Sequence, residues 1–197
     1  MSKRIFDILI ACAGLLALAP ALVIIAAWIK WDSPGPVLFF QQRVGRRGRL
    51  FSIAKFRTMH HRPQEGAQLT VGRDSRITGA GHVLRRFKLD ELPQLLNVVA
   101  GSMSLVGPRP EVPRYVACYP PAMRALVLSV APGITDWAAI EYKDENTLLA
   151  SFNDPERTYI EQILPDKLNH YARYVRERNF WMDLQIIFRT LAAVVVH

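Results

Sequence analysis

The residues best suited to carry chemistry are two adjacent carboxylates, Asp90 and Glu91, within the segment Leu89-Asp90-Glu91-Leu92-Pro93-Gln94. Because neighbouring side chains on a helix point about 100° apart, the two carboxylates cannot share one task. The spacing instead suits a division of labour, in which one carboxylate reaches the reacting atom and the other holds a metal ion. The structural alternative is a helix start, where acidic residues before a proline complement the helix dipole.

A rigid loop with a single arginine follows at Gly107-Pro108-Arg109-Pro110. The two prolines restrict the backbone, so little conformational entropy is lost when the guanidinium of Arg109 binds a phosphate through two hydrogen bonds. A purely structural turn is the alternative. Arg85 and Arg86 precede Asp90 by about one helical turn, which can bring them near the same site.

These residues together favour carboxylate attack on a pyrophosphate. Asp90 is ionised at neutral pH and, unlike a serine, needs no general base. Its difficulty is the approach to an anion. The arginines and a divalent metal ion on Glu91 would ease this approach by neutralising charge and stabilising the departing phosphate. Mg²⁺ is the natural ion for oxygen ligands and phosphate.

Charge and composition narrow the setting of this chemistry. A chain of 197 residues is long enough for one domain with its own core and too short for two large ones. The net charge of +8 is concentrated in residues 30–88, whereas residues 89–197 are slightly acidic. A basic region suits anionic lipid headgroups, nucleotides or phosphorylated substrates, and nucleic acid would fit the charge equally well. We expect Cys12 and Cys118 to be reduced core thiols, because they lie far apart and match no metal-ligand spacing.

An apolar segment near the start of the sequence indicates a position at a membrane. Residues 8–29 contain no charged side chain and would form a helix of about 33 Å, long enough to cross a bilayer. Pro20 lies mid-segment, where it removes the hydrogen bond to the Leu16 carbonyl and bends the helix. Basic residues flank both ends, and the positive-inside rule draws both flanks to the cytoplasmic face. A bent helix that enters and leaves on the same side satisfies these requirements; a single-pass helix is the alternative.

The hydrophobic pattern of the remaining sequence predicts a mainly α fold with one small β-hairpin, of the α+β class. β-prone runs flank a Gly-Arg-Arg-Gly turn and predict the hairpin over residues 37–57, and the polar residues 60–81 predict a loop. Helices are expected over residues 82–99 with an interruption at Pro93, 115–130, 155–164 and 165–196. Within the last of these, residues 182–196 are suited to lie in a membrane interface. We therefore expect a membrane helix over residues 1–31 and a cytoplasmic, membrane-associated catalytic domain over residues 32–197.

Five motifs occur in order along the sequence and carry a resemblance to a known family. They are Gln41-x-Arg43-Val44-Gly45, Lys55-Phe56-Arg57-Thr58-Met59, Leu89-Asp90-Glu91-Leu92-Pro93-Gln94, Ser104-Leu105-Val106-Gly107-Pro108-Arg109-Pro110-Glu111 and Pro132-Gly133-Ile134-Thr135. With this set the sequence resembles the small monotopic phosphoglycosyl transferases, which are bacterial sugar transferases. The resemblance covers nearly the whole sequence.

The resemblance implies an activity and a location. It implies transfer of a phospho-sugar from a UDP-sugar to polyprenol phosphate, with release of UMP, as the first membrane step of glycoconjugate or exopolysaccharide synthesis. It also implies a re-entrant helix broken at Pro20, with the catalytic domain on the cytoplasmic face of the bacterial inner membrane. The partners expected are UDP-sugar, polyprenol phosphate and membrane lipids, but no nucleic acid; a homodimer is left open.

The resemblance also assigns roles to individual residues. Asp90 falls on the family's covalent nucleophile, which implies a ping-pong mechanism, and Glu91 falls on its Mg²⁺ ligand. Arg85 and Arg109 fall on its catalytic arginines. We expect substrate to be bound by Gln41, Arg43, Lys55, Arg57, Pro108 and Pro110.

Three departures from the family pattern bear on membrane insertion and specificity. Ala19 precedes the helix-breaking proline where the family often has Ser, Asp136 stands where Gly usually follows Pro-Gly-Ile-Thr, and residues 138–149 differ from many members. The sequence therefore does not specify the sugar. Two other functional classes stay open. One is a non-catalytic membrane scaffold of a polysaccharide assembly complex. The other is a membrane-tethered nucleic-acid-binding protein, although the sequence carries no RNA-binding aromatic motif or zinc-ligand spacing.

Overall fold

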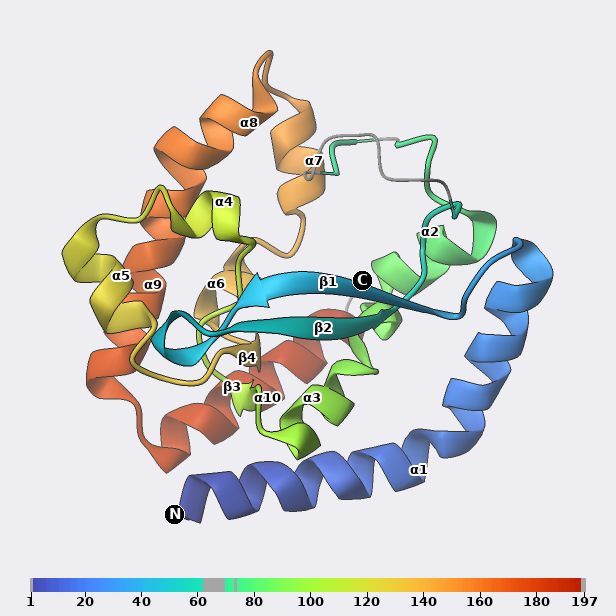
Figure 1. The fold of residues 1–197 in the computed structure, drawn as a ribbon, viewed down its shortest axis with the longest axis horizontal. Helices are drawn as coiled ribbons and strands as arrows, with labels where there is room; N and C mark the ends of the chain where they lie inside the picture. Colours follow the sequence, from blue (N-terminus) through green and yellow to red (C-terminus); the bar gives the residue numbers. More distant parts are fainter. Residues whose placement is uncertain (1, 62–69, 73, 196–197) are drawn as a thin grey trace.

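The computed structural model describes residues 2–61, 70–72 and 74–195, and its fold is mainly helical with two small sheets (Figure 1). The predicted mainly α fold with a β-hairpin is confirmed. Of the loop expected over residues 60–81, residues 62–69 and 73 lie outside the described residues. The helices are α1 (Ser2–Asp32), α2 (Gly79–Arg86), α3 (Gln94–Ala100), α4 (Pro113–Val116), α5 (Pro121–Val127), α6 (Trp137–Glu141), α7 (Glu145–Ala150), α8 (Pro155–Thr158), α9 (Leu164–Glu177) and α10 (Phe180–Val195). The strands are β1 (Leu38–Val44), β2 (Leu50–Phe56), β3 (Ser104–Val106) and β4 (Gly133–Thr135).

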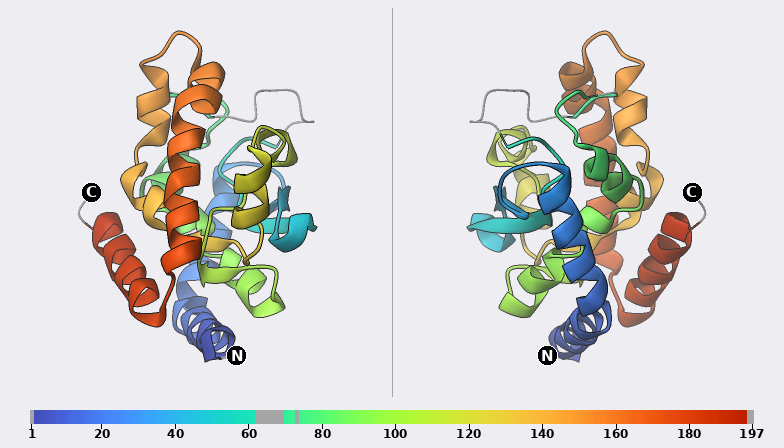
Figure 2. Two further views of the ribbon diagram at one scale, coloured as in Figure 1. Left: turned by 90° about the vertical axis from the view of Figure 1, so that its left-hand side faces the viewer. Right: turned by 90° about the vertical axis from the view of Figure 1, so that its right-hand side faces the viewer.

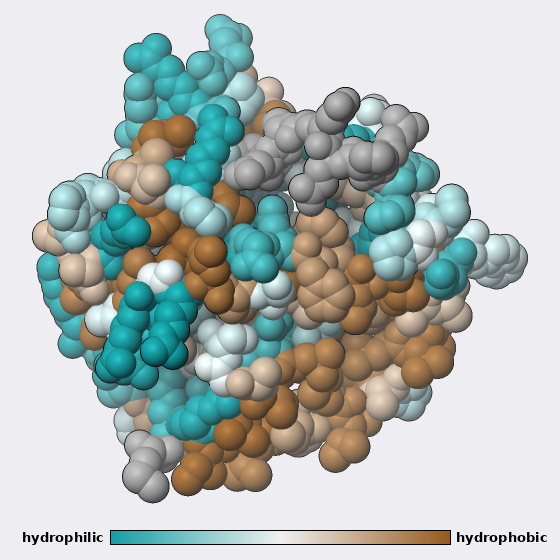
Figure 3. All heavy atoms as spheres, viewed as in Figure 1, coloured by the Kyte–Doolittle hydropathy of each residue, from teal (hydrophilic) through white to brown (hydrophobic). Residues whose placement is uncertain are grey.

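The N-terminal helix α1 is continuous over 31 residues, including Pro20. Figure 1 shows that it runs along the base of the molecule and then turns up one side, as expected of a helix that contains a proline. Within the described residues, it is the one helix long and apolar enough to cross a membrane. Most of its apolar segment is not buried by the rest of the protein, and Figure 3 shows hydrophobic residues gathered along this base.

The start of α1 is fastened to the rest of the domain. The Arg4 guanidinium donates hydrogen bonds to the carbonyl oxygens of Val98 and Val99, near the end of α3, at 2.6 and 3.1 Å. About one turn later, the buried Asp7 carboxylate accepts a hydrogen bond of 2.7 Å from the Ser104 hydroxyl on β3. These contacts fix the first half of α1 against α3 and β3.

The far end of α1 is held by the same domain. The Asp32 carboxylate accepts a hydrogen bond of 3.1 Å from the Ala80 amide at the start of α2. Arg57, which directly follows β2, donates to the carbonyl and hydroxyl oxygens of Ser33 at 2.9 and 2.7 Å. Both ends of α1 therefore contact one folded unit, although the helix between them is apolar and largely uncovered.

β1 and β2 form the predicted antiparallel hairpin, in which Val44 lies opposite Leu50 at the closed end. The turn is a short 3₁₀ segment in which Arg47 has a positive φ of 58°. The Arg47 amide donates a hydrogen bond of 2.7 Å to the Leu128 carbonyl, which docks the hairpin tip on the end of α5. The hairpin is thus fixed at its tip as well as along its buried face.

The prediction of a helix over residues 82–99, interrupted only at Pro93, is wrong. α2 ends at Arg86, Lys88 adopts a left-handed conformation with a φ of 54°, and a 3₁₀ turn over Leu89–Glu91 follows. α3 begins only after Pro93, whose missing amide hydrogen costs nothing at a helix start. The change of direction at Lys88 places the two carboxylates on a turn between two helices.

Prolines also set other boundaries that the sequence pattern missed. The helix expected over residues 115–130 is divided into α4 and α5, because Pro121 starts a second helix. The helix break expected before Pro165 does not occur, because this proline lies in the first turn of α9, directly after a π-helical turn. The break falls instead at Arg178 and Asn179, before α10.

Among the described residues the core has three hydrophobic clusters: one joins the second half of α1 to β2 and α2, and the other two share α9. Of the two clusters that share α9, one joins it to α4 and α5 and includes Tyr171, and the other joins it to α1, β2, α3 and α10 and includes Tyr174. Figure 2 shows α9 running through the height of the molecule, with α6 and α7 on one side and α5 and the hairpin on the other. Both cysteines are free; Cys12 is half-buried, but Cys118 is exposed, so the core position predicted for Cys118 is wrong.

Candidate functional site

Asp90 and Glu91 are consecutive, but their carboxylates have different partners. Glu91 accepts a hydrogen bond of 2.8 Å from the Lys55 ammonium, and it forms an ion pair with Arg109 through both guanidinium nitrogens, one of them at 3.2 Å. Within the described part of the chain, no hydrogen bond or ion pair engages the carboxylate of Asp90, although this residue is only 8% exposed. The turn therefore presents one fixed carboxylate and one free carboxylate.

The surroundings shift the pKa values of the two acids in opposite directions. Burial would raise the pKa of Glu91, but the charges and hydrogen bonds of Arg109 and Lys55 outweigh burial and hold this pKa well below its ordinary value. Burial raises the pKa of Asp90, and Lys55 and Arg85 only partly oppose the change because neither forms an ion pair with it. Glu91 is therefore a stable anion, whereas Asp90 is a poorly compensated one.

Three basic side chains from separate elements surround the turn. Lys55 comes from β2, Arg85 from α2 and Arg109 from the loop that follows β3. The Arg85 guanidinium donates hydrogen bonds to the hydroxyl groups of Thr58 and Thr70, at 2.8 and 3.2 Å. The structure thus brings together the residues predicted to be catalytic, while their roles in a reaction stay predictions.

A short parallel β-pair that the sequence pattern did not predict positions the loop of Arg109. Next to the pair of β3 with β4, the Gly107 amide donates to the Thr135 carbonyl at 3.1 Å, and the Gly133 amide donates to the Pro108 carbonyl at 3.0 Å. A Cβ atom on Gly133 would lie 2.1 Å from the Gly107 nitrogen. The two backbones can therefore touch only because glycine has no side chain.

Gln41 and Arg43 lie on β1 and support this loop. Arg43 donates hydrogen bonds to the Pro110 carbonyl at 3.1 Å and to the side-chain oxygen of Gln41 at 2.6 Å. It also lies 3.6 Å from the buried Glu111 carboxylate, which accepts a hydrogen bond of 2.7 Å from the Tyr159 hydroxyl. Substrate binding by Gln41 and Arg43 stays a prediction; in this structure Arg43 holds the Pro110 carbonyl and Gln41 contacts the Arg43 side chain.

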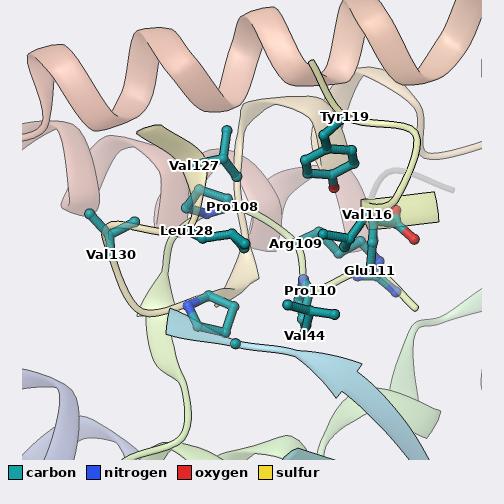
Figure 4. A pocket seen from close by; sticks show the side chains of 12 residues that line it. Val44, Pro108, Arg109, Pro110, Glu111, Val116, Tyr119, Val127, Leu128 and Val130 are labelled. Carbon is teal, nitrogen blue, oxygen red and sulfur yellow. The ribbon is translucent and has the colours of Figure 1, made fainter. Parts of the chain in front are cut away.

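A small pocket lies behind the same loop (Figure 4). Residues Pro108 to Glu111 form one wall, and the ends of β1 and α5 form the others. Figure 4 shows the Tyr119 hydroxyl directed toward Arg109. The space inside is about 10 Å³, roughly that needed by one water molecule, so a nucleotide cannot bind here. The two prolines of the loop, Pro108 and Pro110, line this pocket, and their expected part in substrate binding stays a prediction.

Arg57 and Pro20 do not join the carboxylates. In addition to its contacts with Ser33, the Arg57 guanidinium donates a hydrogen bond of 2.6 Å to the Pro36 carbonyl, and the side chain is buried where α1 meets the hairpin. Its expected role in substrate binding stays a prediction, because these contacts serve to hold α1. Pro20 lies inside α1, as its predicted role in the membrane requires.

The Glu91 carboxylate is the kind of ligand that Mg²⁺ prefers, and Mg²⁺ binding by this residue stays a prediction. This ion prefers oxygen ligands, and the lowered pKa of Glu91 keeps its carboxylate ionised at neutral pH. Both oxygens of Glu91 accept hydrogen bonds from Lys55 or Arg109, so a bound ion would have to replace one of these cations. Glu91 is therefore suited to bind the ion only after Lys55 or Arg109 has moved from Glu91 to another anion, such as a substrate phosphate.

Several buried residues around the loop were not predicted to belong to the site. Asp136 attracted attention in the sequence only as a departure from the family pattern, and Tyr159 and Tyr171 not at all. Tyr159 and Tyr171 are distant from Arg109 in sequence, and aromatic residues at helical spacing are typical of an ordinary core. No local sequence signal could have identified these two tyrosines.

Comparisons with known proteins show that the chain belongs to the bacterial sugar transferase family. The family model for bacterial sugar transferases matches residues 1–197. The chain is 36% identical, over 98% of its length, to UDP-N-acetylgalactosamine-undecaprenyl-phosphate N-acetylgalactosaminephosphotransferase of Aeromonas hydrophila. It is 40% identical over 97% of its length to undecaprenyl-phosphate glucose phosphotransferase of Komagataeibacter xylinus. It spans only 43% and 35% of these two relatives, but 85% of the exopolysaccharide production protein ExoY of Rhizobium meliloti, to which it is 33% identical over 98% of its length.

Proposed function

Because the chain belongs to the bacterial sugar transferase family, we propose that it transfers a phospho-sugar from a UDP-sugar to polyprenol phosphate. The names of the Aeromonas and Komagataeibacter relatives support this type of acceptor, and the former also supports a UDP-sugar donor. The observation that carries the proposal is the contrast between the paired carboxylate of Glu91 and the free carboxylate of Asp90.

The first step is attack by Asp90 on the β-phosphate of the UDP-sugar. A bond forms between a carboxylate oxygen and the β-phosphorus, and the bond from this phosphorus to the oxygen that bridges the two phosphates breaks. UMP leaves with that oxygen and its electron pair. Burial without an ion pair favours attack by the Asp90 carboxylate, because the carboxylate loses its poorly compensated charge when its oxygen bonds to phosphorus, while the transferred phosphate keeps its own negative charge.

The second step regenerates the enzyme. An oxygen of polyprenol phosphate attacks the phosphorus that Asp90 holds, the bond between this phosphorus and the aspartate oxygen breaks, and the carboxylate is restored. The product is a polyprenyl-diphosphate sugar. Asp90 attacks in its ionised form and polyprenol phosphate attacks as an anion, so neither step needs a general base.

The basic residues provide the charge that two phosphates require. Lys55 and Arg109 are fixed on Glu91 before substrate binds, so their positive charges are already in place. Arg85 comes from a different element, α2, and its positive charge acts to lower the pKa of Asp90. Mg²⁺ held by Glu91 would add positive charge beside the phosphates when bound. In this arrangement the arginines bind the phosphate oxygens and stabilise the departing UMP.

The contacts at both ends of α1 support a re-entrant membrane helix. Arg4 at one end and Asp32 at the other bind the same folded unit. A helix across the bilayer would carry its ends to opposite faces of a hydrocarbon layer about 30 Å thick, so both ends could not contact one domain. We therefore place the apolar bend of α1 in the cytoplasmic leaflet of the inner membrane and the catalytic domain on the cytoplasmic face.

The last helix, α10, lies against α1 and belongs to the side of the molecule that we place at the membrane. The Phe180 ring at the start of α10 packs edge-on against the Phe6 ring on α1, with 5.2 Å between centroids. Trp181 and Phe188 on α10 are 77% and 68% exposed, which is unusual for large apolar side chains unless lipid covers them. We therefore place α10 in the membrane interface beside α1, the position that its sequence also favours.

A transfer assay tests the proposed function. The full chain in lipid nanodiscs is incubated with Mg²⁺, polyprenol phosphate and each of a panel of UDP-sugars, and UMP and the lipid product are quantified by mass spectrometry. We expect UMP and polyprenyl-diphosphate sugar in equal amounts for at least one sugar, and neither with Asp90→Asn. A non-catalytic scaffold would give no product with any sugar, and unchanged turnover in Asp90→Asn would reassign the nucleophile.

A further inference from the structure

The contact between β3 and β4 brings a second acid close to the arginine loop. The Thr135 carbonyl accepts the hydrogen bond from the Gly107 amide, and Asp136 is the next residue along the chain. The Asp136 side chain is 1% exposed. One of its oxygens accepts a hydrogen bond of 2.9 Å from the Ala139 amide and thereby caps α6.

The other carboxylate oxygen of Asp136 has no such role. Its Oδ2 atom is buried and, among the residues the structure describes, has no hydrogen-bond partner. The hydroxyl group of Tyr171 on α9 is also buried and has no hydrogen-bond partner among the described residues. Such atoms are costly, because each loses its hydrogen bonds to water without replacement, and the described residues include six of them. These two belong to the residue that follows the β4 contact with Gly107 and to α9.

Electrostatics connects both groups to Arg109. Glu91 contributes most to raising the pKa of Arg109, and Tyr171 and Asp136 add to the effect. The charge of Asp136 in turn contributes to the raised pKa of Tyr171, after the larger effect of burial. Arg109 therefore has an ion-pair partner on the turn, Glu91. It also interacts electrostatically with Asp136 and Tyr171, each of which has an unpartnered oxygen among the described residues.

We propose that Asp136 and Tyr171 are positioning residues that hold the Arg109 guanidinium when it turns from Glu91 to the phosphates of the substrate. The inference rests on the proposed function, because it assigns a role within the same reaction. A guanidinium has five N–H donors, and two phosphate oxygens satisfy only part of them. The unpartnered Asp136 oxygen and the Tyr171 hydroxyl group can accept hydrogen bonds from the remainder, directly or through one water molecule.

The simpler role of Asp136 is the cap of α6, and substitution by asparagine separates the two roles. Asparagine caps a helix as well as aspartate does, so a capping role alone would survive Asp136→Asn. The substitution removes the negative charge that would hold Arg109. Tyr171→Phe removes only the hydroxyl group, which forms no hydrogen bond with any described residue. Asp154 caps α8 in the same way but is exposed, so Asp154→Asn is a matched control.

The experiment measures kcat and KM for the UDP-sugar, and the melting temperature, in the full chain and its variants. We expect Asp136→Asn to lower kcat about tenfold and Tyr171→Phe about threefold, with KM changed less than threefold and no fall in melting temperature, because Arg109 acts mainly on the departing phosphate. The double variant should lose about tenfold rather than about thirtyfold, since both residues act through one guanidinium. Asp154→Asn should match the wild type.

Three results would overturn the inference. They are a kcat of Asp136→Asn within twofold of the wild type, losses that multiply in the double variant, and a loss of activity matched by a lower melting temperature. In each case wild-type transfer stays intact, so the proposed function would survive. A wild-type protein that forms neither UMP nor lipid product refutes the proposed function, and the inference with it.

Discussion

The Lys55 ammonium lies 2.8 Å from an Oε atom of Glu91, which links the β-hairpin to the turn that carries the carboxylates. The contact orients Glu91 and also brings positive charge close to Asp90, where it partly offsets the rise in pKa that burial causes. A single lysine on β2 thus serves both acids. Its position explains why the hairpin must be docked at its tip and along its buried face.

Replacement of Lys55 tests this link. We expect Lys55→Met to lower kcat about 10- to 100-fold, because the site loses a fixed positive charge near the phosphates. Lys55→Arg should restore part of the activity. Lys30→Met is a suitable control, since Lys30 donates a hydrogen bond to the Gly35 carbonyl just beyond α1 and, among the described residues, contacts neither carboxylate. Wild-type turnover in Lys55→Met would remove this lysine from the mechanism.

The two acids should affect stability in opposite directions. At pH 7, Asp90→Asn should leave the melting temperature equal or higher, because it removes a buried charge that has no ion-pair partner. Glu91→Gln should destabilise the protein by about 3–5 kcal/mol, because Lys55 and Arg109 lose their common anion. Both variants should be inactive. Thermal unfolding in one detergent checks the comparison, and equal shifts of the same sign would contradict it.

The stability effect of Asp136 should depend on pH. Burial raises its pKa from 3.8 to about 6, so the folded protein binds a proton more tightly than the unfolded chain. The resulting stabilisation is complete below pH 3.8 and is lost as pH rises through about 6. At pH 7.5, Asp136→Asn should therefore have a higher free energy of unfolding than the wild type, by up to about 3 kcal/mol, and a higher melting temperature. Both differences should vanish near pH 4. A difference that grows toward pH 4 would have the wrong sign.

A re-entrant α1 should expose neither end to the periplasm. Ile5 and Trp31 lie near the two ends and are 54% and 92% exposed, so cysteines at these positions suit labelling in a background without Cys12 and Cys118. In intact cells, a membrane-impermeant maleimide should label neither Ile5→Cys nor Trp31→Cys, and it should label both after lysis. Labelling of one end in intact cells would establish a single-pass helix instead.

The elements with long or strongly patterned sequences could be predicted. The apolar run of α1 and the two β-prone runs around an arginine turn carry enough residues to specify their structure. The strands β3 and β4 have three residues each, too few to show an alternating pattern. The division between α2 and α3 depends on the left-handed backbone conformation of Lys88, and no sequence pattern predicts this conformation for a lysine.

The candidate site could be predicted only in part for a similar reason. The motifs identified Asp90, Glu91 and Arg109 as residues, but not which acid the cations would bind. Lys55 and Glu91 are 36 residues apart, and Glu91 and Arg109 are 18 apart, so their pairing depends on the fold. The same limit applies to Asp136, whose place beside the arginine loop depends on the close approach of two glycines.

The central claim is that Asp90 becomes covalently bonded to the phosphorus of the sugar phosphate. The direct measurement incubates the full chain with Mg²⁺ and a UDP-sugar that it uses, but without polyprenol phosphate, and follows UMP release and the intact protein mass. We expect a burst of one UMP per site and a mass increase of one phospho-sugar, located on Asp90 by peptide mapping and absent in Asp90→Asn. Transfer-competent protein that releases no UMP without the acceptor, or that carries the phospho-sugar on another residue, would contradict the account.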